Sequence, residues 1–261
     1  RPTLFRMAAV FSRQPVPSSR PCVWLKRGRI SWTLAENRPA HFSDPVGESE
    51  ETDRVLPVIE GLAGQVAIPI SIDTTKAAVA RQAVAAGATM INDVSALRTD
   101  PEMAATTARC RVPIILMHMK GTPKTMQVKP TYEDLVSDIR TFLSDAMDRA
   151  VAGGVARSAI ILDPGIGFGK TIGHNLQLIR DLERFHELAA PLLVGPSRKM
   201  FIRQLLKDPS QKDMDPLSVD VARGTQAAVA AAAMKGAHIV RVHDVARTRA
   251  TLAVVNAIAS V

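Results

Sequence analysis

The sequence predicts an α/β fold of parallel strands and helices, and three observations favour that class. From residue 67 onward, short apolar runs rich in β-branched residues alternate with longer amphipathic stretches. The length of 261 residues agrees with the roughly 250 residues of a single α/β barrel. The chain is 46% hydrophobic but only 4% aromatic, which indicates a core of aliphatic residues between helices and a parallel sheet.

Six short runs are the strand candidates, and each is apolar on both faces, as expected of strands that are covered on both sides. They are Ile68–Ile72, Met90–Asn92, Pro113–Met117, Ala159–Leu162, Leu192–Val194 and His238–Val242. Successive strand–helix units favour a parallel sheet, and an eight-stranded barrel needs two strands more. We therefore predict a (β/α)8 TIM barrel that is incomplete, with six clear βα units and its first two strands absent or atypical.

Two helices are predicted with their ends. The stretch Tyr132–Ala152 carries apolar residues at three- and four-residue spacing, and Thr131 with Asp134 resembles a capping pair at its start. The Ala-rich stretch Val219–Lys235 ends at Gly236, a residue type that commonly follows a helix.

Residues 1–45 form an atypical basic segment, and residues 46–261 form the predicted barrel domain. The segment has eight basic and two acidic residues, and its prolines interrupt any regular period. Only residues 1–66 remain for the two missing strands, and Asp53–Leu62 already predicts a helix. A transit peptide, a disordered arm, and strands lost by truncation, a frame error or a defective gene are the three interpretations.

The net charge of +8 comes mainly from this segment, because the remainder has 25 basic and 23 acidic residues. That distribution argues against a nucleic-acid partner. No apolar run reaches the roughly 18–20 residues of a membrane span. The two cysteines, without a CxxC motif, argue against a disulfide framework or a zinc site and favour a reducing, cytoplasmic location.

Polar or ionisable residues follow every predicted strand. In a parallel barrel the carboxyl ends of the strands form the rim that carries function. We therefore expect the following segments to meet at one rim: Asp73–Lys76, Asn92–Ser95, Met117–Pro123, Asp163–Lys170, Gly195–Lys199 and Arg241–Asp244.

Single acidic and amide residues in these segments also have a simpler interpretation. Asp73 and Asn92 are of the types that cap a following helix, and the same role suits Asp93 and Asp244. Only their joint placement at strand ends points to a binding site.

The basic residues have simpler interpretations as well. His118 lies between two methionines and suits an interior position, whereas Lys120 and Lys170 suit solvated charges at the rim. The run Pro164–Thr171 approaches a phosphate-binding loop, but proline replaces its first required glycine and removes a backbone donor. A tight turn that exposes Asp163 is the interpretation that we favour.

Taken in order, the rim segments resemble the motifs of the dihydropteroate synthase family over roughly residues 46–261. The motifs are SIDTTK, INDVSAL, LMHMKGTPKTMQ, ILDPGIGFGK, VGPSRK and RVHDV. The resemblance implies a transferase of folate biosynthesis that joins 4-aminobenzoate to 6-hydroxymethyl-7,8-dihydropterin diphosphate and releases diphosphate. Both substrates are small molecules.

The resemblance also implies how a pterin ring would be held. Asp163 would accept two parallel hydrogen bonds from the guanidine-like edge of the ring, with Asp73 and Asn92 completing that edge. Lys199 would donate to the acceptor side of the ring. Arg241 would stack its guanidinium plane on the ring, a geometry that lysine cannot reproduce.

Further roles follow from the same resemblance. Val94, Met117 and Phe168 would form apolar walls around the ring. Ser197 and Arg198 would bind the aminobenzoate. The diphosphate would lie against Arg241 and His243, so the catalytic group is Lys199, Arg241 and His243; Mg²⁺ is expected with the diphosphate, since hard oxygens suit it.

Two family motifs are not found intact. They are the loop after the first strand, approximately NVTPDSFSDGG, which supplies an Asn ligand for the metal, and GGESTRPG after the second. Phe42–Asp44 and Gly47–Ser49 are only fragmentary echoes of them. Hence diphosphate binding and the activity of this chain are in question, and the metal ligands are unassigned.

The alternatives are a pterin-binding barrel of the methyltetrahydrofolate methyltransferase type, which has no need of the SRK loop or the RVHD ending, and an inactive truncated remnant. A homodimer through the late helices is expected from the family.

Overall fold

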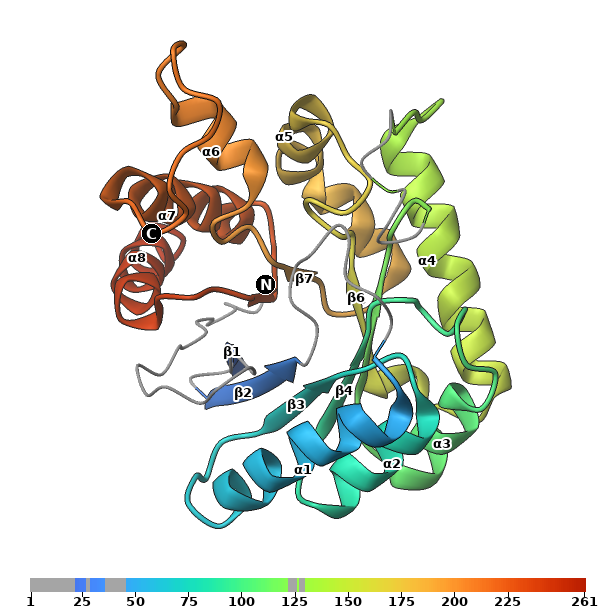
Figure 1. Ribbon diagram of the computed structural model, residues 1–261. Helices are drawn as coiled ribbons and strands as arrows, with labels where there is room; N and C mark the ends of the chain where they lie inside the picture. Colours follow the sequence, from blue (N-terminus) through green and yellow to red (C-terminus); the bar gives the residue numbers. More distant parts are fainter. Residues whose placement is uncertain (1–21, 27–28, 36–45, 122–125, 127–129) are drawn as a thin grey trace.

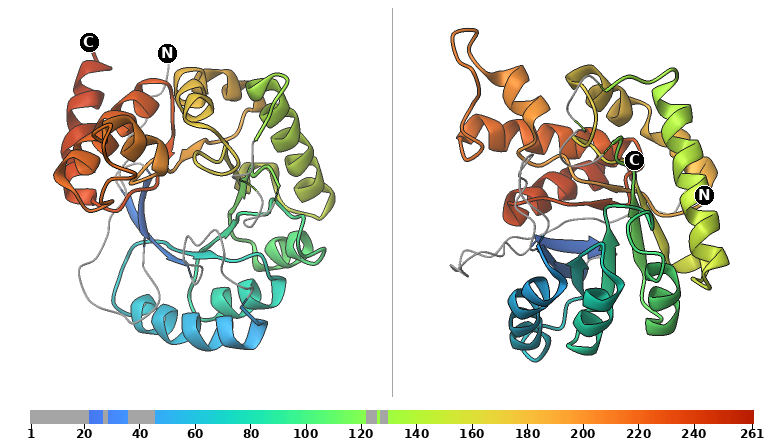
Figure 2. Two further views of the ribbon diagram at one scale, coloured as in Figure 1. Left: turned by 45° about the horizontal axis from the view of Figure 1, so that its top comes forward. Right: turned by 45° about the vertical axis from the view of Figure 1, so that its right-hand side comes forward.

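The computed structural model describes residues 46–121, 126 and 130–261, together with the backbone of two strands at residues 22–26 and 29–35. Two sheets curve around a common interior, and the helices cover their outer side (Figures 1 and 2). None of the helices in this part of the chain has the length and apolar character needed to span a bilayer.

Eight strands make up the two sheets. The larger sheet runs in chain order through β1 to β6, and the smaller sheet pairs β7 with β8. A parallel bridge from Leu162 to Leu192 joins the two. The strands are β1 (Cys22–Lys26), β2 (Arg29–Ala35), β3 (Ile70–Asp73), β4 (Met90–Asp93), β5 (Ile114–Met117), β6 (Ile160–Asp163), β7 (Leu193–Val194) and β8 (Ile239–Val240).

A helix follows each parallel strand from β2 onward and crosses back over the outside of the sheet. The helices are α1 (Glu48–Ala63), α2 (Ala77–Ala85), α3 (Met103–Cys110), α4 (Leu135–Ala152), α5 (Ile172–Arg180), α6 (Met200–Leu206), α7 (Val219–Met234) and α8 (Val245–Ile258). Short 3-10 turns at Arg157–Ala159 and Leu182–Leu188 lead into β6 and β7.

The core lies between the strands and these helices. Ile91 and Leu116 on the strands are fully buried, and so are Ile139 and Leu143 on α4 and Phe185 in the 3-10 turn beside it. Helices on one side and a filled interior on the other exclude water from both strand faces, which is why the strands lack a polar face. This packing fixes the positions of the strand ends.

The predicted strands after residue 67 are confirmed to within one or two residues, and α7 has the predicted start. The capping prediction for α4 is wrong in part. The helix begins at Leu135, and the Asp134 side chain alone caps it by accepting from the backbone N–H groups of Val136 and Ser137, each at 3.1 Å.

The amino-terminal segment departs from a regular barrel, as predicted, but it contains two strands. β1 and β2 form an antiparallel hairpin, and β2 is parallel to β3, so that β2, α1 and β3 make a regular βαβ unit. β1 lies beside β8, yet no hydrogen-bonded ladder joins them in the described part of the chain. The predicted domain boundary at residue 45 remains a prediction.

One proposed echo of the family motifs is wrong. Gly47 is the N-cap of α1, and Glu48 and Ser49 lie in the first turn of that helix instead of ending a strand. Helix formation there follows from the acidic residues Glu48, Glu50 and Glu51, which stabilise a helix amino terminus. The other echo, Phe42–Asp44, lies outside the described residues.

Candidate functional site

The ends of β3, β4, β6 and β8 and the loop after β7 bring five predicted residues to one rim. Asp73 and Asp163 are the last residues of β3 and β6, Asn92 is the penultimate residue of β4, and Arg241 directly follows β8. Lys199 follows β7 and is the N-cap of α6. Their common position results from the parallel arrangement of the strands.

Asp73 connects two neighbours across this rim. Asn92 Nδ2 donates to Asp73 Oδ1, and Arg241 Nη2 donates to Asp73 Oδ2 at 2.6 Å. Burial raises the pKa of the Asp73 carboxyl, while the Arg241 charge and the Asn92 hydrogen bond oppose that change. The simpler interpretation of Asp73 and Asn92 as helix caps does not apply, since Lys76 and Glu102 are the N-caps of the helices that follow and both side chains are used in this contact.

Asp163 is only 8% exposed, and its Oδ1 accepts from the backbone N–H of Gly165 at 2.7 Å. Burial raises the pKa of this carboxyl, and the charges of Lys199, Lys170 and Arg241 act in the opposite direction. A buried carboxylate can accept two parallel hydrogen bonds, so it suits a ligand that has two neighbouring N–H groups along one edge.

Lys199 interacts electrostatically with Asp163 and lies beside an aromatic ring. Its Nζ donates to the carbonyl of Ile166 and lies 4.1 Å from the centroid of the Phe168 ring. Burial lowers the pKa of Lys199 to about 7, an effect that the charge of Asp163 opposes and that of Arg241 strengthens. The ammonium and the neutral amine are therefore both accessible near neutral pH.

The turn before Lys199 is held at several points. Ser197 Oγ lies 2.8 Å from Nδ1 of His243 and accepts from the His243 backbone N–H at 3.2 Å. Arg198 has a left-handed backbone conformation with φ of 59°, and its N–H donates to Thr225 Oγ1 at 3.2 Å. Thr225 on α7 and His243 after β8 thus fix this turn from two different elements.

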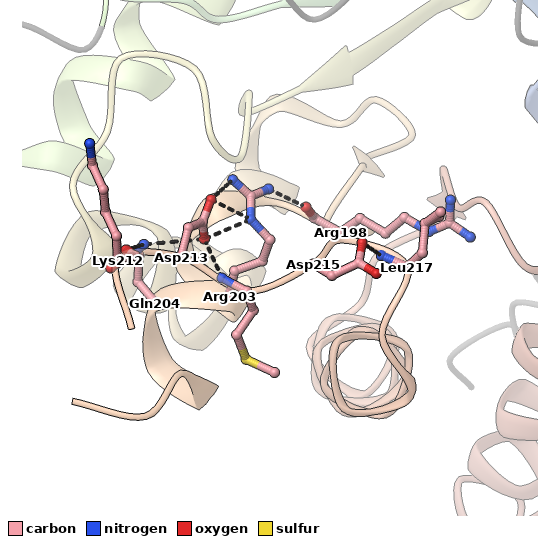
Figure 3. A network of polar contacts seen from close by, with 8 residues as sticks. Arg198, Arg203, Gln204, Lys212, Asp213, Asp215 and Leu217 are labelled. Carbon is pink, nitrogen blue, oxygen red and sulfur yellow. Dashed lines mark hydrogen bonds and ion pairs between the residues drawn. The ribbon is translucent and has the colours of Figure 1, made fainter. Parts of the chain in front are cut away.

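Figure 3 shows a third support of the same turn, centred on Arg203 and Asp213. Arg203 Nη1 donates to the Arg198 carbonyl at 2.8 Å, while its Nε and Nη2 bind the Asp213 carboxylate at 3.0 and 2.9 Å. Gln204 also reaches Asp213, at 3.3 Å. These residues were not predicted from the sequence, because Asp213 lies within the irregular loop between α6 and α7 and no period connects it to Arg203.

The three predicted wall residues lie at the same rim. Met117 ends β5, is 3% exposed, and is paired in register with Asp163. Val94 directly follows β4 and is partly exposed, and Phe168 lies in the loop after β6. Apolar groups at the same strand ends as the polar cluster agree with a ligand that has apolar faces.

Of the other two acidic residues, Asp244 has the helix-cap role that the sequence allowed, whereas Asp93 holds a turn and caps no helix. Asp93 accepts from the backbone N–H groups of Ser95 and Leu97 at 2.8 and 2.7 Å. Asp244 is the N-cap of α8 and accepts from the Arg247 N–H at 3.1 Å. Both stabilise backbone turns, so neither side chain is directed at the cluster.

The loop Asp163–Lys170 is a tight turn with positive φ at Gly165, Gly167 and Gly169. Lys120 is exposed, as expected, and His118 is 5% exposed, as expected of an interior histidine. The prediction of a solvated Lys170 is wrong, because this side chain is only 1% exposed and lies 2.9 Å from Nδ1 of His118. Nothing in the sequence indicated this burial, because it depends on how the preceding glycine-rich turn folds back onto the barrel.

Comparison with known proteins agrees with the class that the fold and the site define, a pterin-binding barrel. Residues 33–243 match the family described as "Pterin binding enzyme". The match begins within β2, so it includes part of the amino-terminal segment that was predicted to be atypical.

Among curated relatives, the chain is 47% identical to dihydropteroate synthase of Synechocystis over 203 residues, which are 78% of this chain and 68% of the relative. It is 42% identical to the Escherichia coli enzyme over 213 residues, 81% of this chain and 72% of the relative. The chain therefore belongs to the dihydropteroate synthase family, whose members are transferases that form dihydropteroate.

Solved structures of the family have the same fold. The Yersinia pestis dihydropteroate synthase with a sulfonamide drug matches with a TM-score of 0.80 at 41% identity, over 87% of this chain and 79% of that one. The Xanthomonas albilineans enzyme with 4-aminobenzoic acid matches with a TM-score of 0.77 at 40% identity, over 88% of this chain and 80% of that one.

Gly165 gives a direct test of the turn that presents Asp163. An added Cβ would lie 1.8 Å from the His118 carbonyl oxygen, and φ is +72°. We expect Gly165→Ala to lower the free energy of unfolding by more than the roughly 1–2 kcal/mol of the left-handed conformation alone. Urea denaturation of the variant and the parent measures this change in the free energy of unfolding.

Gly61 is the matched control for this substitution. It is exposed in α1, with nothing within 4 Å of the added Cβ. Gly61→Ala should raise the free energy of unfolding by about 0.5–1 kcal/mol, since alanine is the better helix former. Equal effects of the two substitutions would show that the turn has another conformation.

Proposed function

We propose that this chain forms dihydropteroate at the rim described above, from 4-aminobenzoate and 6-hydroxymethyl-7,8-dihydropterin diphosphate. The observation that supports this assignment is the contact between side chains from separate strand ends, with Asp73 bound to Asn92 and Arg241, and Lys199 close to Asp163. The related Xanthomonas albilineans enzyme has been solved with 4-aminobenzoic acid and with 7,8-dihydropteroate.

The pterin ring would bind by its donor edge to Asp163. One oxygen of that carboxylate already accepts from Gly165, and the remaining acceptor positions can take the paired N–H groups of the ring. Asp73 and Asn92 complete the same edge. Apolar contact with Val94, Met117 and Phe168 would remove the faces and sides of the ring from water.

The two cations have separate roles. Lys199, held against Ile166 and Phe168, would donate to the acceptor side of the ring. Arg241 would stack its guanidinium plane on the ring, with Asp73 fixing the orientation of that plane through the hydrogen bond from Nη2. The ion pair also keeps the Asp73 charge compensated inside the site.

Substitution occurs at the exocyclic carbon of the pterin. The lone pair of the aminobenzoate nitrogen forms the new C–N bond, the C–O pair leaves with the diphosphate, and the nitrogen passes a proton to the departing diphosphate or to water. Arg241 and His243 would stabilise the negative charge that develops on the leaving group. Ser197 and Arg198 would orient the aminobenzoate, so that catalysis consists of positioning and charge stabilisation without a covalent intermediate.

Mg²⁺ remains a prediction drawn from the family. In the part of the chain that the structure describes, no three His, Cys, Asp or Glu side chains come together as a metal site. Mg²⁺ commonly binds through one or two side chains together with substrate phosphates, so the ion would be held mainly by the diphosphate. None of the steps above depends on it. A cytoplasmic location likewise remains a proposal, which the free thiol of Cys110 supports.

The pterin site is tested by removing its charges. Asp163→Asn and Arg241→Ala should each abolish measurable binding of the pterin diphosphate, because each leaves a buried partner unpaired. Isothermal titration calorimetry measures the affinity. Asp220→Asn and Arg223→Ala, which alter an exposed pair on α7, are matched controls that should bind normally. Unchanged affinity of the first two variants would refute the assignment.

Lys199 predicts how binding depends on pH. With a pKa of about 7 in the free site, the side chain is an ammonium below that value and a neutral amine above it. Since the charged form donates to the pterin, affinity should be highest below the pKa and fall by up to about tenfold per pH unit above it. Calorimetry from about pH 6 to about pH 9 measures this slope.

Lys199→Arg is the matched variant for this pH dependence. Its guanidinium stays protonated over the whole range, so the decline at high pH should disappear even where the overall affinity is lower. The same slope in both proteins would assign the titration to another group.

A homodimer is the assembly that we propose. Large apolar side chains are exposed on α7 and α8, a feature typical of an interaction surface; they include Val219 (57%), Met234 (65%), Val254 (61%) and Ile258 (56%). Sedimentation equilibrium should give the mass of two chains for the parent protein. The double variant Met234→Glu, Val254→Glu should give the mass of one chain. A monomer at micromolar concentration would contradict the proposal.

A further inference from the structure

Lys170 is a buried lysine that none of the roles above uses, and burial lowers its pKa well below the usual value, an effect that the charge of Asp163 opposes. It ends the loop Asp163–Lys170, and its side chain is 1% exposed. A buried ammonium is unfavourable unless hydrogen bonds and nearby opposite charge compensate it. Its position therefore calls for a physical reason.

The head group of Lys170 makes two hydrogen bonds that join separate parts of the site. Nζ lies 2.9 Å from Nδ1 of His118, and it donates to the carbonyl of Phe168 at 2.9 Å. Burial and the Lys170 charge lower the pKa of His118 to about 2, so its imidazole is neutral and Nδ1 can accept the hydrogen bond from Lys170 Nζ. Lys170 thus connects the strand end at His118 to the wall residue Phe168.

The same head group lies under the turn that presents Asp163. A Cβ on Gly165 would be 3.4 Å from Lys170 Nζ, and the Gly165 N–H is the donor to the Asp163 carboxylate. The His118 N–H in turn donates to the Asp163 backbone carbonyl at 2.9 Å. The Gly165 N–H therefore holds the Asp163 carboxylate and the His118 N–H holds the Asp163 backbone, while a positive charge on Lys170 opposes the rise in the Asp163 pKa that burial causes.

The far end of the loop is fixed independently. Tyr132 Oη donates to the Gly169 carbonyl at 2.7 Å, so the loop would stay attached to the body of the protein without the lysine. Lys170 adds a link between Phe168, in the middle of the loop, and His118. This link acts together with two hydrogen bonds of the turn, from the Phe168 N–H to the Gly165 carbonyl at 3.0 Å and from the Gly167 N–H to Asn175 Oδ1 at 2.6 Å.

We propose that Lys170 is a positioning residue for pterin binding, which holds the turn at Gly165 and the Phe168 wall against His118 so that Asp163 presents its carboxylate to the donor edge of the ring. This inference rests on the proposed function, because it assumes that Asp163 is the pterin carboxylate. It assigns Lys170 no contact with either substrate.

Lys170→Met tests the proposal, because methionine keeps an unbranched side chain of similar length but removes the three donors. We expect the dissociation constant of the pterin diphosphate, measured by calorimetry, to rise about tenfold or more. The KM for aminobenzoate, at saturating pterin diphosphate, should stay within about twofold, and the thermal midpoint should change little because removing a buried charge offsets the lost hydrogen bonds.

A purely structural role would have a different signature. It would lower the thermal midpoint of unfolding and weaken the binding of both substrates together. The control is Lys235→Met, which removes an exposed lysine at the end of α7 paired with Glu183 and should leave both constants unchanged. Pterin affinity within about twofold of the parent in a folded Lys170→Met protein would overturn the proposal.

A second pair of variants decides the matter if Lys170→Met does not fold. His118→Asn keeps an acceptor near the position of Nδ1, whereas His118→Leu fills the space but offers no acceptor. We expect the Asn variant to bind the pterin more tightly than the Leu variant, although the Leu variant should be the more stable. The reverse order of affinities would show that His118 and Lys170 only fill the core.

Asp163→Asn separates this inference from the proposed function. Lost pterin binding in Asp163→Asn, with normal binding in Lys170→Met, would overturn the role of Lys170 and leave the function intact. Normal binding in both would overturn the function.

Discussion

The ion pair between Asp73 and Arg241 joins strand ends that are 168 residues apart and belong to different sheets. Neither charge is well solvated, with side-chain exposures of 13% and 28%, so each depends on the other for compensation. Asp163 and Lys199 lie close by and balance their charges in the same way. The site therefore exists only when the chain is folded from β3 to β8, and the whole barrel serves to hold these few groups at fixed positions.

Periodicity in the sequence predicted most of the fold. The strands after residue 67 were found because strands buried on both faces are short apolar runs, and Leu135 to Ala152 because its stripe has a helical period. The amino-terminal hairpin was not found, since Cys22–Lys26 and Arg29–Ala35 mix charged and apolar residues without a clean alternation. Gly47 to Ser49 was misread as a strand end because short motifs carry no information on register.

The site was predictable where it lies at strand ends. Parallel strands place their carboxyl ends at one rim, and this rule alone brought Asp73, Asn92 and Asp163 together. This rule could not predict the contacts of Arg203 and Lys170. Their partners Asp213 and His118 come close to them only because of the path that the intervening loops take. Burial of a charge is a tertiary property, so residue type alone predicted the wrong environment for Lys170.

The central claim is that side chains from separate strand ends meet on one pterin ring, and a crystal structure of this chain with the bound pterin diphosphate tests it most directly. The account predicts the donor edge of the ring within hydrogen-bonding distance of Asp163, with Asn92 beside it and the Arg241 guanidinium parallel to the ring plane. A ring bound elsewhere on the barrel, or bound at this rim with Asp163 turned away from it, would contradict the account.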